Sequence, residues 1–65
     1  MDMSMRKMVE EAYDETVSEA IAAGHAADLA HKEGVTAAAM FLSSMTGVED
    51  LMARSQIESL GLEPN

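Results

Sequence analysis

The chain of 65 residues contains no cysteine and no tryptophan, and only one tyrosine, one phenylalanine and one proline. Without cysteine it can form neither a disulfide nor a thiolate metal site. A domain this small buries only about 60% of the surface of its unfolded chain, and it usually needs a disulfide, a metal or a partner chain. We therefore predict one helical domain over residues 1–65, with frayed ends at 1–3 and 63–65, that completes its core with other copies of itself.

Basic residues are also few, since four face twelve acidic ones and the formal net charge is −8. Proteins that bind nucleic acid cluster lysine and arginine to neutralise phosphates, whereas Arg6, Lys7, Lys32 and Arg54 are scattered. The charge argues against direct binding to nucleic acid or to anionic membranes. The longest apolar run, residues 37–42, is too short to span a bilayer, and no secretory leader pattern is present. We expect a cytoplasmic protein.

What the chain does contain is helix-forming residues, including eleven alanines, while β-branched and aromatic residues are few. This composition predicts an all-α fold, a small bundle of three or four helices. The first helix is expected over residues 4–23, with Ser4 as its N-cap. Its apolar residues recur at helical spacing and make it amphipathic: Met5, Met8, Val9, Ala12, Tyr13, Thr16, Val17, Ala20 and Ile21.

Gly24 allows two interpretations. It could end the first helix in a left-handed conformation, or it could lie inside a longer helix at a cost of about 1 kcal/mol relative to alanine. The flanking residues favour helix on both sides, so we favour a continuous or kinked helix that reaches His31. Gly34 is expected to be the firmer stop, because Lys32 precedes it and Thr36 offers a new N-cap.

A short helix is then expected over residues 37–45, closed by Gly47. Residues 37–42 are apolar around the whole circumference, and a helix of that kind is buried on more than one side. A chain of a few short helices has little with which to cover the second side. A partner copy is the expected cover.

The spacing of Thr46 and Glu49 predicts a capping box for a last helix over residues 48–60, with Gly61 as a left-handed cap. The apolar residues of this helix fall on two different faces, which indicates either contacts with two neighbours or different roles for its two ends. The predicted oligomer interface draws on both short helices and comprises Ala38, Phe41, Leu42, Met45, Leu51, Met52, Ile57 and Leu60.

The first helix carries acidic residues four positions apart, such as Glu11 and Glu15, and each like-charge pair costs a few tenths of a kcal/mol. Three interpretations are open: a solvated face that keeps the protein soluble, a docking face for a basic protein surface, or a cation site shared between two copies. We take the second as the functional prediction. The acidic partner face comprises Glu11, Asp14, Glu15 and Glu19.

Metal binding and catalysis have little support. His25, Asp28 and His31 lie three residues apart, a spacing that serves metals in helical bundles, but the opposing ligands would have to come from the solvated acidic face. We predict no metal ligand and no cofactor. The chain has no cysteine nucleophile, no glycine-rich phosphate loop and no serine in a recognisable elbow, so we predict no enzyme.

The sequence thus predicts a non-enzymatic, acidic helical module for protein–protein interaction that acts as a homodimer or higher oligomer. One alternative is a small, phage-type regulator or inhibitor that acts on a nucleic-acid-binding protein or on nucleic acid. Residues 38–61 have the outline of a helix-turn-helix, although the expected recognition helix carries only Arg54 as a base. The other alternative is a helical bundle that binds a metal through carboxylates and histidines.

Overall fold

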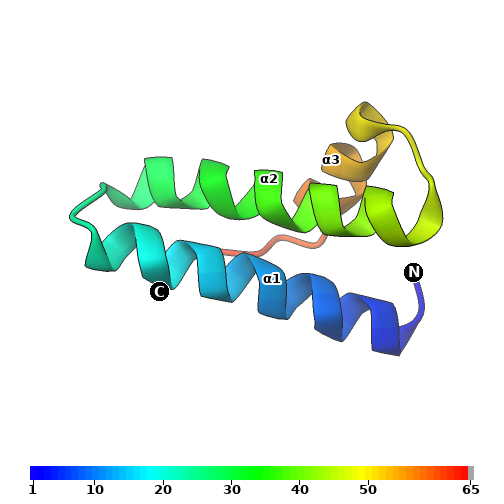
Figure 1. Cartoon of the computed structure of the whole chain (residues 1–65), viewed down its shortest axis with the longest axis horizontal. Helices are drawn as coiled ribbons and strands as arrows, with labels where there is room; N and C mark the ends of the chain where they lie inside the picture. The colour runs from blue at the N-terminus through cyan, green and yellow to red at the C-terminus, as the bar shows by residue number, and fades with distance from the viewer. Residues whose placement is uncertain (65) are drawn as a thin grey trace.

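The computed structural model describes residues 1–64, and within that range it contains three α-helices and no strand. Helix α1 spans Met3–Ala22, α2 spans Ala27–Thr46 and α3 spans Asp50–Ser59. Helices α1 and α2 run antiparallel along most of their length (Figure 1), and α2 packs against both other helices. The predicted all-α fold and small helical bundle are confirmed. None of the three helices is long and apolar enough to cross a membrane.

Helix α1 begins earlier than predicted. Its N-cap is Asp2 rather than Ser4, and the Asp2 Oδ1 atom accepts a hydrogen bond of 2.8 Å from the Met5 backbone N–H. An aspartate at this position satisfies one of the unpaired amide groups of the first turn, as a serine would. The predicted fraying of residues 63–65 falls in part on residue 65, which lies outside the described residues.

Helix α1 ends just before Gly24, so the prediction of a continuous helix through this residue is wrong. Gly24 has a φ of +93°, in the left-handed region. Its N–H donates to the Ile21 carbonyl at 2.9 Å, and the His25 N–H donates to the Ala20 carbonyl at 3.0 Å. This pair of bonds is the Schellman motif, which ends a helix and satisfies its last carbonyls.

Gly34, predicted to be the stop, lies inside α2 and is buried. The predicted N-cap, Thr36, is likewise interior, and its hydroxyl donates to the Lys32 carbonyl one turn earlier at 2.9 Å. A Cβ atom at Gly34 would lie 2.7 Å from both Tyr13 Cδ2 and Val17 Cγ2. The glycine is therefore needed for the close approach of α2 to α1.

The expected turn after α2 is present in part. Gly47 closes the helix with a φ of +75°, as predicted, and Gly61 has a φ of +70° beyond the end of α3. The capping box does not form, because the Glu49 side chain accepts from the Leu51 N–H at 2.9 Å and so caps α3 itself. The Thr46 hydroxyl oxygen instead accepts from the Val48 N–H at 3.3 Å.

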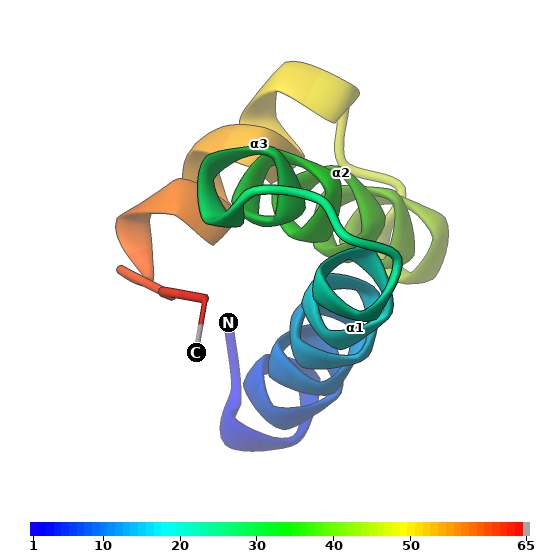
Figure 2. The same ribbon diagram turned by 90° about the vertical axis from the view of Figure 1, so that its left-hand side faces the viewer.

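The core lies along α2, which Figure 2 shows between α1 and α3. Two sides of α2 are therefore covered within one chain, while Met40, within residues 37–42, stays exposed. All three helices contribute buried apolar side chains: Val9, Tyr13, Val17, Ala20, Ala30, Val35, Ala38, Ala39, Leu42, Ala53 and Ile57.

Candidate functional site

The residues predicted to form an oligomer interface separate into three groups. Ala38, Leu42 and Ile57 are at most 2% exposed, because α3 packs back onto α2. They belong to the core of the single chain and do not lie on a surface that a second copy could contact. Phe41 and Leu60 are partly buried and pack against the edge of this core.

The remaining three predicted interface residues, Met45, Leu51 and Met52, are exposed. Sequence reasoning missed Met40, which is 65% exposed on the side of α2 that neither neighbouring helix covers, and Leu29, which is also exposed. A separation of eleven residues returns nearly to the same face of a helix, so Leu29 and Met40 share this uncovered side. The signal was present, because Met40 lies two positions from both Ala38 and Leu42 and so points away from them.

A hollow of about 310 Å³ lies beside Met40 on this uncovered side. Helix α2 contributes most of its walls, and Thr16 supplies the α1 rim. Glu19, one turn after Thr16, is next to that rim, and Glu15, one residue before Thr16, lies about 100° further round α1. The lining residues from α2 are Lys32, Glu33, Thr36, Ala37 and Met40.

Next to this hollow, a groove of about 500 Å³ runs between α2 and α3. The Arg54 Nη2 atom reaches across it and donates to the Thr36 Oγ1 atom at 3.1 Å. Arg54 has an acid one turn before it, Asp50, and one turn after it, Glu58, yet neither pairs with it within 4 Å. The groove is lined by His31, Lys32, Val35, Thr36, Arg54 and Glu58.

Tyr13 of α1 forms a hydrogen bond with His31 of α2, which is one of the residues that line this groove. The Tyr13 hydroxyl and His31 Nδ1 share a hydrogen bond of 2.6 Å, and the two rings meet edge to face. Burial raises the pKa of the Tyr13 hydroxyl above its ordinary value, and the carboxylates of Asp14 and Glu63 raise it further. The hydroxyl therefore stays protonated through the neutral range and holds the His31 ring in place.

The three residues weighed as metal ligands do not converge. His25 Nδ1 lies 2.9 Å from Glu33 Oε2 across the turn between α1 and α2. His31 is bonded to Tyr13, and Asp28 Oδ1 accepts from the N–H of the next residue at 3.0 Å. Throughout residues 1–64, no three histidine or acidic side chains are grouped in a way that could hold a metal ion.

The acidic partner face lies on α1, where Glu11, Asp14, Glu15 and Glu19 are all exposed. None of these four carboxylates forms an ion pair with the described part of the chain. Their mutual repulsion is thus relieved only by solvent and counterions in the single chain.

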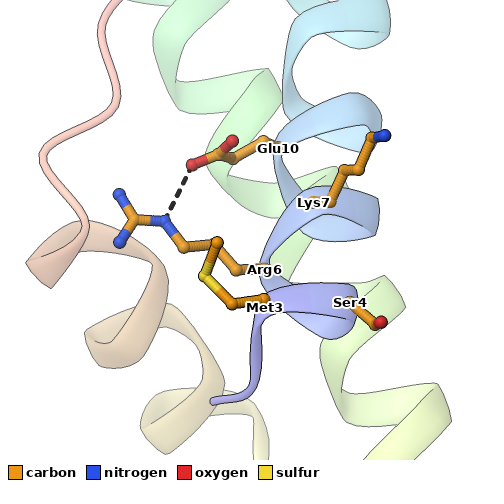
Figure 3. Close-up of a pocket in the computed structure, with 5 residues that line it drawn as sticks. All are labelled: Met3, Ser4, Arg6, Lys7 and Glu10. Atoms are coloured by element: carbon orange, nitrogen blue, oxygen red, sulfur yellow. Dashed lines mark hydrogen bonds and ion pairs between the residues drawn. The ribbon is translucent and has the colours of Figure 1, made fainter.

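The surface depression at the start of α1 is open to solvent, and no set of polar or charged side chains converges on it. Arg6 Nε donates to Glu10 Oε2 at 2.9 Å, which uses both charges within one helix. Figure 3 shows Lys7 and Ser4 pointing away from this pair, so the turn offers no enclosed site for a ligand.

Comparison of the chain with models of protein families, with curated proteins and with solved structures finds no match. Two surfaces of the chain stand out by their chemistry: the uncovered side of α2 with Met40, and the groove in which Lys32 and Arg54 lie without a carboxylate partner among the described residues.

Proposed function

We propose that this protein is a non-enzymatic interaction module that associates with a second copy of itself through the uncovered side of α2, and whose acidic face docks on a basic protein surface. The observation that carries this proposal is the exposure of Met40, 65%, on the central helix of the bundle. Helices α1 and α3 occupy two sides of α2 and leave the third to solvent.

Burying a methionine side chain fully contributes about 1.5–3 kcal/mol. In a two-fold dimer the same face of each copy meets the other, so the contribution of each residue counts twice. Methionine is flexible and polarisable, which suits a contact between two curved helix surfaces. Leu29 and the half-buried Ala37 extend the apolar surface along the same side of the helix.

The acidic face supports the second part of the proposal. Its four carboxylates repel one another, and a basic partner would turn this repulsion into attraction. Charge of one sign on one face also raises the rate at which an oppositely charged partner is encountered.

The self-association is tested by replacing Met40. Met40→Asp places a charge at the centre of the proposed contact, and we expect sedimentation velocity to show a shift from dimer to monomer with unchanged helical circular dichroism. Met3→Asp is the matched control, because Met3 is even more exposed, at 83%, but lies in the first turn of α1 and does not line the hollow beside Met40. This control should sediment like the wild type.

A wild-type chain that sediments as a monomer up to high micromolar concentrations would overturn the proposal. So would a Met40→Asp variant that associates as tightly as the Met3→Asp variant.

A further inference from the structure

The groove between α2 and α3 holds an ordered positive charge in a strongly acidic protein. Arg54 has acids one turn away on both sides, Asp50 and Glu58, but its guanidinium reaches Thr36 on the other helix. The Thr36 hydroxyl is itself fixed, because it donates to the Lys32 carbonyl. This bond uses one of the five N–H groups of the guanidinium and leaves the others for a further acceptor.

Lys32 connects this groove to the uncovered side of α2. Lys32 and Thr36 line both the groove and the hollow beside Met40, so they form the ridge between the two. On the opposite rim of the hollow lies Thr16 of α1. Glu19 lies one turn after Thr16 and Glu15 one residue before it. The surface therefore runs from these acids across the hollow, which holds Ala37, Met40 and the Glu33 that is bonded to His25, to the cations.

A surface with this order is complementary to its own copy. A two-fold axis that passes through the hollow parallel to α2 brings the acidic rim of each copy to the basic ridge of the other, and the same contact forms twice. We propose that Glu15 and Glu19 of one copy pair with Lys32 and Arg54 of the partner subunit, with the Met40 side chains in contact between the two sets of ion pairs. This inference rests on the proposed self-association and names the basic surface on which the acidic face docks.

The charges of the whole molecule make this alignment selective. Each copy carries a net charge of −8, so most ways of bringing two copies together place like charges against each other. The arrangement that places the cation ridge against the acidic rim replaces repulsion by attraction at both contacts. Arg54 is already held by Thr36, so it loses less side-chain freedom on pairing than a free arginine would.

The experiment exchanges the charges between two variants. Variant one carries Lys32→Glu and Arg54→Glu, and variant two carries Glu15→Lys and Glu19→Lys. We expect each variant alone to associate at least tenfold more weakly than the wild type, because both contacts then join like charges. An equimolar mixture should recover a heterodimer of near wild-type affinity, since both contacts again join opposite charges. Sedimentation measures the affinities and native mass spectrometry identifies the heterodimer.

The matched control for charge is the pair Arg6→Glu and Lys7→Glu, which changes the net charge as variant one does but lies at the start of α1. An equimolar mixture of this control with variant two should not recover the wild-type affinity. Circular dichroism checks the fold of every variant. If variant one does not fold, the neutral pair Lys32→Gln and Arg54→Gln should still weaken the dimer severalfold, and an unchanged affinity would overturn the inference.

The outcomes separate this inference from the proposed function. A wild-type dimer that both charge variants reproduce at full affinity overturns the ion pairs and leaves the apolar contact standing. A wild-type monomer overturns both proposals. A monomer whose groove residues respond to inorganic phosphate, followed by nuclear magnetic resonance, would instead assign Lys32 and Arg54 to a small anion and overturn the inference.

Discussion

Gly34→Ala is the substitution that most directly tests how α1 and α2 pack. Gly34 lies in the interior of α2, where alanine normally stabilises a helix by about 1 kcal/mol relative to glycine. By helix propensity alone the variant should be more stable than the wild type. The contacts of the added Cβ atom give the opposite expectation.

The added Cβ would lie 2.7 Å from Tyr13 Cδ2, 2.7 Å from Val17 Cγ2 and 2.8 Å from Tyr13 Cε2. Overpacking of a core costs about 1–3 kcal/mol, and the upper end applies because a ring and a β-branched side chain yield little. After the gain in helix propensity, the net loss is about 2 kcal/mol. In a domain of this size each 1 kcal/mol lowers Tm by about 4–8 °C, so we expect a Tm about 8–16 °C lower.

Thermal and urea unfolding followed by circular dichroism measure this loss. Ser44→Ala, at an exposed position of the same helix, is the control and should change the free energy of unfolding by no more than about 0.5 kcal/mol. The double variant Gly34→Ala with Val17→Ala should lose less stability than the sum of the two single variants, because the smaller side chain makes room. A Gly34→Ala variant with the Tm of the wild type or a higher one would refute the close approach as the reason for this glycine.

Two further predictions concern the hydroxyl of Tyr13. Tyr13→Phe removes the hydrogen bond to His31 and should lower the free energy of unfolding by about 0.5–1.5 kcal/mol in urea titrations at neutral pH; an unchanged midpoint would contradict a structural role for this bond. Because the pKa of Tyr13 is raised in the folded state, its contribution to stability is complete below the pKa of the unfolded hydroxyl, about 10, and is lost as the pH rises through the folded pKa. Tyr13 is the only tyrosine of the chain, so the Tyr13→Phe variant should lose less stability than the wild type between neutral and strongly alkaline pH, and parallel curves would contradict this prediction.

The helical class and two of the helix ends could be predicted from the sequence, because they depend on local properties. Alanine content and the scarcity of β-branched residues indicate helices, and Gly47 and Gly61 follow periodic apolar segments directly. Gly24 and Gly34 were assigned the wrong way round. Both lie between helix-forming residues, and the difference between them is the ring of Tyr13 on the preceding helix, which no local pattern contains.

The predicted interface shows the same limit from another side. Helical spacing indicates which residues share a face, but it does not say which element covers that face. Ala38 and Leu42 of α2 and Ile57 of α3 were predicted to contact a second copy, yet all three are buried within the single chain, where α2 packs against α1 and α3. The direction of Arg54 could not be predicted either, since it depends on how closely α3 approaches Thr36.

Gly34 also links the stability of the fold to the proposed dimer surface. The acidic rim beside Thr16 belongs to α1, whereas Met40 and the cation ridge belong to α2, so their relative position depends on the packing of these two helices. At Gly34 this packing leaves no room for a Cβ atom beside Tyr13 and Val17. A Cβ atom at this point that moves the helices apart would also move the acids away from the position that matches Lys32 and Arg54 of the partner subunit. Residue 34, which is buried and touches no partner, would then control which surfaces of the two copies meet.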